Sequence, residues 1–457
     1  MASEITEDSQ IKDLQTFSPL PEDEEAPLKE SESVTVFNFI KLNPGLSKQN
    51  FYCLIIHHVL LVLSISIPGA IQPLIILNPE YYNVPQEKAG KIHSIVLIVQ
   101  LVVKLCVSIP YGHLVDRLGR KFMIHYGALS FLVGCLIISS QTSIFPGFIF
   151  GQFFITNATS ALFSVPLSAD YIADESKGKA SAFLFMFFGF GGLAGNLIVK
   201  ALFHLEISLG KCYVIIGLAS CGAFFLNTLG LKSHYKHLIV HGNTAESRES
   251  LINKIKEAMQ IFKSNGWLKI LLVVQILGSS DFHVFFSLFA VFTKSLFPKD
   301  VDEHTQNLVV NNIQTFVSIP MILANIVYGS FLDKKHMIIK ILVFALGGGS
   351  VSFLFIAFSK DPYAWTIKFG AILLGSTLPG LFTISSYLGI KNYPPDKRGL
   401  MSGISGIMGT IGYFVLATTS GVLYDSWRKD GPFLICSGLL IVAIILVIKI
   451  YRNMSYN

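Results

Sequence analysis

The chain has 457 residues, of which 52% are hydrophobic and only 14% are charged. Soluble domains carry about 25% charged residues, so this composition excludes a soluble globular protein and indicates a helical integral membrane protein. The net charge of +6 does not indicate a nucleic-acid-binding protein, because the cations lie in the polar connections and form no basic stripe among aromatic residues. The six cysteines are scattered without the spacing of metal ligands, so we expect neither a metal site nor a cofactor.

The first 48 residues are acidic and rich in serine. They lack the basic start and the early apolar run of a signal peptide. We therefore expect residues 1–48 to form a disordered cytosolic tail.

Twelve apolar segments follow, and each is read as one membrane span. They lie near residues 51–73, 92–111, 122–140, 145–169, 180–203, 211–231, 268–292, 307–330, 337–358, 364–388, 400–422 and 432–451. The sequence thus predicts an all-α membrane protein of twelve transmembrane helices. It predicts an N-terminal six-helix bundle at 49–231, a C-terminal six-helix bundle at 267–451 and a short tail at 452–457.

The one long connection, residues 232–266, contains a helical pattern. Its apolar residues fall on one face of a helix, as in a helix that lies on a membrane surface: Leu251, Ile252, Ile255, Met259 and Phe262. Lys and Arg are more frequent in this linker and in the other connections on the same side of the membrane. The positive-inside rule then places both termini and the linker in the cytosol.

The connection between segments 92–111 and 122–140 is short and strongly charged. It holds one carboxylate, three cations and two glycines, namely Gly112, Asp116, Arg117, Gly119, Arg120 and Lys121. A weaker copy, Gly329 and Asp333, lies 217 residues further on. A second motif before the fifth span, Glu175 and Gly178, recurs 221 residues later as Asp396, Arg398 and Gly399. Two motifs repeated in the same order indicate duplicated halves, which in such proteins frame a site near the middle of the membrane.

These residues resemble the major facilitator superfamily. The loop between spans 2 and 3 of that family reads roughly Gly-x-Leu-x-Asp-Arg-x-Gly-Arg-Lys/Arg, and residues 112–121 match every fixed position. The resemblance covers about residues 50–450 and implies a transporter whose two halves rock around a central site. It does not identify the transported solute. An Arg early in the fourth span and a proline in the glycine-rich fifth span, both typical of drug–proton antiporters, are absent.

The charged motifs are expected to gate the cytosolic side. The Asp116 carboxylate can accept hydrogen bonds from the free N–H groups at a helix N-terminus, where the helix dipole favours negative charge. By resemblance to the family, that helix is the eleventh span, which starts near Arg398 and Gly399. Asp333 would bind the fifth span near Gly178 in the same way. The alternative is that the motifs are turns whose charges only orient the protein.

Polar side chains inside the spans are candidates for solute or proton binding, because they are costly at membrane depth. The candidates are Lys104, Asp281, His283, His57, His58, Gln275, Asn157 and Asn325. Lys104 could bind an anion or pair with Asp281, and Asp281 with His283 could carry a proton. Each could instead be satisfied internally as a contact between helices.

The sequence predicts a transporter of a small organic solute that works by alternating access. An organic anion or an amino acid is the favoured class, and coupling to protons is left open. The alternative is a transporter-like protein that no longer transports and serves as a sensor or as a structural subunit of a membrane assembly. We expect no enzymatic activity, because the spans show no nucleophile–base pair. The expected partners are the lipid bilayer and the solute, and the expected state is a monomer.

Overall fold

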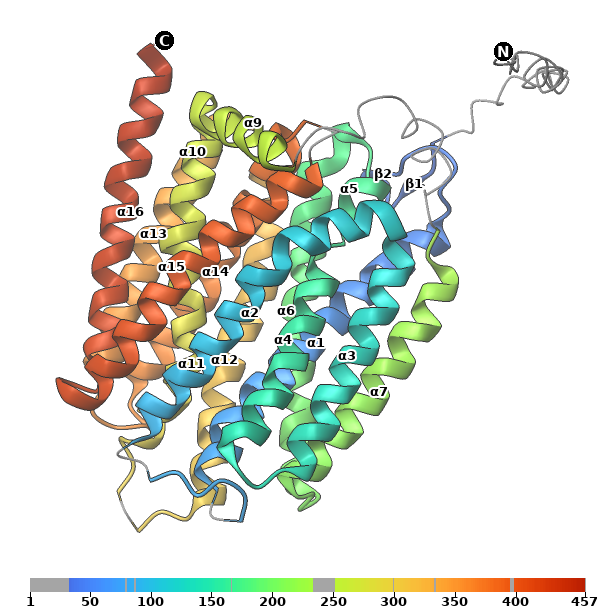
Figure 1. Ribbon diagram of the computed structural model, residues 1–457. Coiled ribbons are helices and arrows are strands. Elements are labelled where there is room, and N and C mark those ends of the chain that lie inside the picture. Colours follow the sequence, from blue (N-terminus) through green and yellow to red (C-terminus); the bar gives the residue numbers. More distant parts are fainter. Residues whose placement is uncertain are drawn as a thin grey trace, which may run out of the picture.

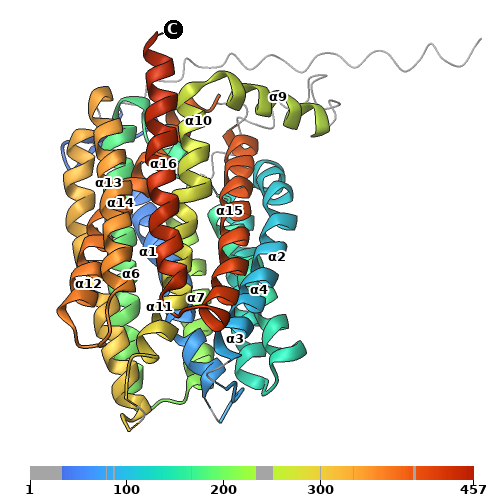
Figure 2. The same cartoon turned by 90° about the vertical axis from the view of Figure 1, so that its left-hand side faces the viewer.

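The computed structural model describes residues 33–456 except 79, 86–87, 166, 233–250, 299, 333 and 395–397. This part of the chain is almost wholly helical, and its long helices lie side by side (Figures 1 and 2). Ten of the described helices are long and apolar enough to cross a membrane. The chain is therefore a multi-pass integral membrane protein.

The first group of helices occupies residues 48–230. Its elements are α1 Lys48–Leu77, α2 Ala89–Leu118, α3 Arg120–Ser140, the π-helix η2 Ile144–Phe148, α4 Ile149–Phe163, α5 Leu167–Tyr171, the 3-10 helix η3 Asp174–Ser176, α6 Lys177–His204 and α7 Leu209–Gly230. Helix α3 packs against α4 and α7, and α1 packs against α6 and α7.

The second group begins with a helix outside the bundle. Its elements are α9 Leu251–Ser264, α10 Gly266–Val273, the π-helix η5 Val274–Gly278, α11 Ser279–Lys294, α12 Glu303–Phe331, α13 Lys335–Ala357, α14 Trp365–Asn392, α15 Arg398–Ser426 and α16 Gly431–Tyr456. Helix α14 packs against α12 and α13, and α13 packs against α16. A large apolar core joins these helices.

Two of the twelve predicted segments do not form single regular helices. In segment 145–169, α4 ends at Phe163, shortly before the proline that follows Val165. In segment 268–292, η5 separates α10 from α11. A further membrane-crossing candidate pairs residues 255–264 with 266–278, but these two pieces meet at a bend of 100°. The described residues thus give ten spans, or eleven with the bent pair, and the count of twelve stays a prediction.

The two groups meet along two pairs of helices. Helix α2 packs along α15, and α6 packs along α12. A glycine permits the close approach of α6 and α12, since a Cβ atom on Gly189 would lie 2.8 Å from Ile322 of α12. In lipid the hydrophobic effect does not drive helices together, so close packing at small residues stabilises their association instead.

The linker helix α9 matches the predicted amphipathic segment. Figure 1 shows it lying across one end of the bundle. Its Ala258 and Phe262 are buried in the apolar core of the second group, and the Phe262 ring packs edge-on against Tyr393 at 6.0 Å. The side chains of Leu251 and Ile252 lie outside the described residues.

The expected disordered tail is wrong for residues 34–46. Here β1 Thr35–Val36 pairs antiparallel with β2 Ile40–Lys41, and the turn between them holds Phe37 and Asn38 at positive φ. Val36, Ile40, Leu42 and Leu46 are at most 3% exposed and belong to an apolar core shared with α1, α2 and α3. Burying these four side chains stabilises the segment. The acidic residues beside it in the sequence had indicated disorder instead.

Candidate functional site

The first charged motif forms the tight junction between α2 and α3. Gly119 has φ 89° and ψ 160°, a conformation that strains any residue with a side chain. This junction directs Arg120 towards α5, and Arg120 Nε donates to Asp170 Oδ2 at 2.9 Å. Arg120 also donates to the carbonyl oxygen of Val115 at 3.1 Å. The charges in the sequence allow Arg117 and Arg120 to pair with Asp170, Asp174 or Glu175, and the structure shows the Arg120–Asp170 pair.

The second motif opens α6. Gly178 is buried in the first turn of the helix, and Lys177 forms an ion pair with Asp174 of η3. Glu175 pairs instead with Lys41 of the hairpin at 2.6 Å. In the weaker copy of the first motif, Gly329 lies against Ala182 of α6, so that a Cβ atom at Gly329 would collide with it.

Several predicted gate residues cannot be placed at side-chain level. Asp333 and Asp396 lie outside the described residues. The same holds for the side chains of Asp116, Arg117 and Arg398, and for the surroundings of Gly399, although their helices are described. Gly112 is buried in α2, and Lys121 is half-buried at the start of α3. The proposed contacts of Asp116 and Asp333 with helix N-termini stay predictions.

Three glutamines from three helices meet inside the first group. Gln100 Nε2 of α2 donates to Gln152 Oε1 of α4 at 2.7 Å and points to Gln72 Oε1 of α1 at 3.4 Å. Gln152 is 1% exposed, and its own Nε2 has no hydrogen-bond partner. An unpaired buried amide costs about 1–3 kcal/mol, so this cluster holds one of the unsatisfied buried polar groups in the described part of the first group.

Sequence reasoning singled out neither Gln100 nor Gln152. The available signal was a glutamine inside each of three apolar segments, but only the fold brings them together. Lys104 and His93 lie on the same face of α2 as Gln100, four residues after it and seven residues before it. Lys104 is half-buried, whereas His93 is 4% exposed and neither ring nitrogen has a partner. Helical side chains lean towards the N-terminus of their helix, so Lys104 leans towards Gln100.

Asp281 lies away from this cluster, on α11. It is 1% exposed, and no N–H or O–H group of the described residues donates to its carboxylate. The Cys436 thiol of α16 lies beside it, so Asp281 faces the interior of the second group. The structure provides no contact between Asp281 and Lys104 among the ion pairs of the described residues. The His283 side chain lies outside the described residues.

The adjacent histidines of α1 face different neighbours. His57 is 2% exposed and packs edge-on against Phe224 of α7, with ring centroids 5.7 Å apart. His58 is half-buried, and its Nδ1 lies 2.9 Å from the carbonyl oxygen of Leu54. His57 therefore belongs to the packing of the first group.

Asn157 makes packing contacts between helices. It bonds to the Tyr111 hydroxyl, and its Nδ2 donates to Tyr126 Oη at 2.7 Å and to Ser130 Oγ at 3.1 Å. These contacts tie α4 to α2 and α3. They match the alternative interpretation of this residue, an interhelical contact.

Asn325 and Asn311 connect the two groups. Asn325 Nδ2 donates to the carbonyl oxygen of Phe185 in α6 at 3.0 Å, and its Oδ1 accepts from Thr383 of α14 at 2.9 Å. Near the other end of the same helix pair, Asn311 Nδ2 donates to the carbonyl oxygen of Asn196 at 3.0 Å. Two amide-to-backbone contacts thus fix α12 against α6. Gln275 lies against Gly409 of α15, where a Cβ atom would be 3.1 Å from its Oε1.

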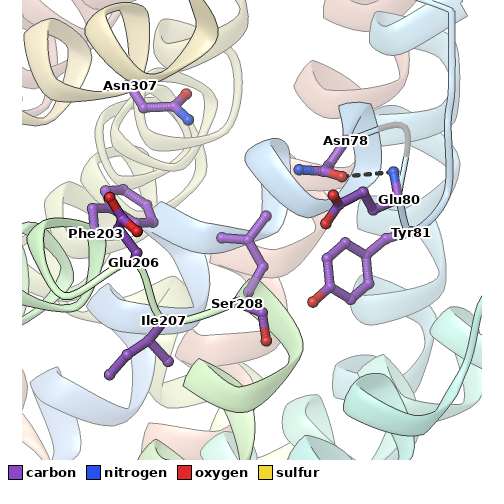
Figure 3. A pocket seen from close by; sticks show the side chains of 9 residues that line it. Asn78, Glu80, Tyr81, Phe203, Glu206, Ile207, Ser208 and Asn307 are labelled. Atoms are coloured by element: carbon purple, nitrogen blue, oxygen red, sulfur yellow. Dashed lines mark hydrogen bonds between the residues drawn. The ribbon is translucent and has the colours of Figure 1, made fainter.

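An open pocket of about 290 Å³ lies at the end of the bundle opposite α9. Figure 3 shows Glu80 and Tyr81 on one side of it and Phe203 and Glu206 on the other. The Asn78 side chain accepts from the Glu80 amide at 2.8 Å and holds this turn. Acidic and aromatic side chains thus line a surface hollow at that end of the molecule.

Comparison with known proteins identifies the family. A sequence model described as the Major Facilitator Superfamily matches residues 54–297 and 297–455. Among curated relatives, the magnetosome protein MamZ of Magnetospirillum gryphiswaldense is 20% identical over 390 residues, which is 82% of this chain and 58% of MamZ. The chain thus spans less than two thirds of the length of MamZ, and the same is true of MamZ from Paramagnetospirillum magneticum, at 57%.

Two further relatives have names that specify transport. The glucose transporter GlcP of Staphylococcus epidermidis is 24% identical over 374 residues, which is 74% of this chain and 80% of GlcP. The multidrug resistance protein 2 of Bacillus subtilis is 23% identical over 358 residues, which is 76% of this chain and 84% of that protein.

Proposed function

Because this chain belongs to the Major Facilitator Superfamily, we propose that it carries a small organic solute across a membrane by alternating access. The family match over nearly all of residues 54–455 carries this proposal. The relatives named as a glucose transporter and as a multidrug resistance protein support general membrane transport. A family of transporters is also consistent with the absence of enzymatic activity that the sequence predicts.

The proposed architecture is two six-helix bundles, at 49–231 and 267–451, joined by the linker 232–266. In this interpretation α4 with η2, and α10 with η5 and α11, complete the ten regular spans to twelve. Helix α3 packs on α4 and α7 within the first group, α13 packs on α14 and α16 within the second, and α2–α15 and α6–α12 are the main contacts between the groups, which supports it. The excess of Lys and Arg in the linker and in the loops at its end of the bundle supports cytosolic termini.

The solute site is proposed to be the glutamine cluster with Lys104. Each amide both donates and accepts hydrogen bonds, which suits the polar groups of a small organic molecule. The unpaired Nε2 of Gln152 can be satisfied by a solute oxygen. Lys104, one turn along α2 from Gln100, supplies a positive charge, which favours an organic anion or the carboxylate of an amino acid.

A transport assay tests the solute site. Purified protein in liposomes is given a panel of labelled organic anions, amino acids and sugars, with and without a pH gradient. Uptake of an anion or amino acid is expected, with a KM raised about tenfold in Gln152→Leu, because one lost hydrogen bond is worth about 1.4 kcal/mol. Gln260→Leu is the matched control, since Gln260 is exposed on α9. Unchanged kinetics in Gln152→Leu would contradict the placement of the site.

The cytosolic gate is proposed to depend on Asp116 and the N-terminus of α15, with Asp333 and α6 as the second pair. The packing of α2 along α15 brings these elements together. Asp116→Asn should weaken the closed cytosolic side and shift the protein towards the inward-open state. Alkylation of single cysteines introduced at the cytosolic end should then accelerate. Equal labelling rates in the variant and the parent protein would reject this role.

A non-transporting role is the second candidate. The relatives MamZ and MamH are named as magnetosome proteins, and MamH of Paramagnetospirillum magneticum is 21% identical over 376 residues. A structural subunit or sensor would show no uptake of any solute in the panel and would co-purify in a stable complex. Uptake by the isolated protein would exclude this candidate.

A further inference from the structure

The hairpin before α1 is attached to one cytosolic loop by several independent contacts. Leu42 forms an antiparallel bridge with Ile172. On either side of this bridge the Asn43 amide donates to Tyr171 O at 3.0 Å, and the Ala173 amide donates to Lys41 O at 3.0 Å. The hairpin therefore extends its small sheet onto the loop between α5 and η3.

Side chains reinforce this attachment. Asn43 Nδ2 donates to the carbonyl oxygen of Asp170 at 2.8 Å, and the Lys41 amide donates to Ser176 Oγ at 3.0 Å. The Lys41 ammonium pairs with Glu175 at 2.6 Å. Contacts thus run along the whole of residues 170–176.

The beginning of the linker joins the same assembly. Tyr171 Oη accepts from the Lys232 amide at 2.8 Å and donates to the Lys232 carbonyl at 3.0 Å. Lys232 Nζ donates to the carbonyl oxygen of Gly45 at 2.7 Å. Burial raises the pKa of Tyr171 to about 12, so its hydroxyl keeps its proton at physiological pH.

The loop held by the hairpin also holds both charged motifs. Asp170 binds Arg120 at the start of α3, and Asp174 binds Lys177 at the start of α6. The hairpin itself contacts neither Arg120 nor Lys177 through any of these bonds. It touches the second motif directly through Glu175 and reaches the first motif through Asp170.

We propose that residues 34–46 form a cytosolic clamp that controls the order of both motifs through the loop 170–176. Docking of the hairpin fixes Asp170 against Arg120 and the first turn of α6 against the rest of the first group. Release loosens both together, which makes the segment before α1 a control point for the cytosolic gate. The effect on gating rests on the proposed transport function, but the coupling between clamp and motifs does not.

Hydrogen–deuterium exchange of the full chain in lipid nanodiscs tests this coupling. Leu42→Asp places a charge at a fully buried position and should release the hairpin. Exchange should then accelerate at least tenfold in residues 170–176 and also in 112–123. Thr35→Ala is the matched control, because Thr35 is exposed on β1. Faster exchange in 34–46 and 170–176 with unchanged exchange in 112–123 would overturn the proposal.

A crosslink keeps the test decisive if Leu42→Asp fails to fold. Leu42 and Ile172 are directly opposed in a pair without mutual hydrogen bonds, a geometry that brings Cα atoms to about 4.5 Å and suits a disulfide. The double variant Leu42→Cys/Ile172→Cys should exchange more slowly in 112–123 when oxidised than when reduced. Equal exchange in the two forms would contradict the clamp. Uptake is measured separately, so a chain that transports nothing leaves this result intact.

Discussion

Arg120 at the start of α3 and Asp170 in α5 form an ion pair of 2.9 Å whose side chains are 14% and 24% exposed. Because water reaches them only in part, their attraction is screened less than that of a surface pair. A double-mutant cycle with Arg120→Ala and Asp170→Ala should give a coupling energy of about 1 kcal/mol from thermal unfolding in detergent. The pair Lys41–Glu175, whose side chains are 42% and 62% exposed, is the control and should give less. If the stability losses of the two single variants add up to the loss of the double variant, the Arg120 pair contributes nothing to stability.

Gly119 permits the sharp junction that aims Arg120. Its φ of 89° with ψ of 160° is a conformation used almost only by glycine. Gly119→Ala should lower the free energy of unfolding by about 1–3 kcal/mol, seen as a lower Tm. Gly222→Ala in α7 is the control, since space around that position is open. An unchanged Tm in Gly119→Ala would mean that the junction tolerates another backbone conformation.

The side chain of Asn325 forms hydrogen bonds that join three helices within the membrane. Asn325→Ala removes its bonds to Phe185 and Thr383 and leaves the Thr383 hydroxyl buried without that acceptor. Interhelical bonds in lipid are worth about 0.6 kcal/mol each, so a loss of about 1–2 kcal/mol is expected in the unfolding of the purified protein. Asn312→Ala, which removes a contact at the exposed rim with Lys200, should cost less. If Asn312→Ala lowered the free energy of unfolding more than Asn325→Ala, Asn325 would not be the stronger contact between helices.

A substitution of Asp281 distinguishes a proton-carrying role of this residue from a structural one. If it carries the coupled proton, Asp281→Asn should fold normally and abolish the dependence of uptake on the pH gradient. The asparagine keeps the shape of the side chain but cannot release a proton in this range. Uptake that remains equally pH-dependent in the variant would exclude Asp281 as the carrier. Binding of the solute to the variant, measured without a gradient, shows that the site itself is intact.

The sequence located the regular spans well because long apolar runs need little tertiary context. The predicted 122–140 and 211–231 became α3 Arg120–Ser140 and α7 Leu209–Gly230. Charge complementarity likewise suggested the contact of Arg120 with Asp170. Where polar residues interrupt a run, as before Asp281, the apolar pattern did not reveal the π-helical turn η5 between α10 and α11.

Two features depended on partners distant in the chain. The glutamine cluster requires three spans to converge. No local pattern therefore distinguishes Gln152, whose Nε2 has no hydrogen-bond partner among the described residues, from Asn157, whose Nδ2 donates two hydrogen bonds. The hairpin has only a few alternating apolar residues beside an acidic stretch. Its stability comes from residues 170–176, which composition cannot reveal.

The distance between these partners also governs the order of assembly. The Lys41 amide and its acceptor Ser176 are 135 positions apart. During synthesis the hairpin leaves the ribosome before α1, yet the loop that it binds follows only after α1, α2, α3, α4 and α5 have been made. During that interval four apolar side chains of the hairpin segment stay exposed, those of Val36, Ile40, Leu42 and Leu46. Docking of the hairpin therefore joins an early part of the chain to a loop that is made much later, and synthesis interrupted before that loop would leave an unpaired strand exposed.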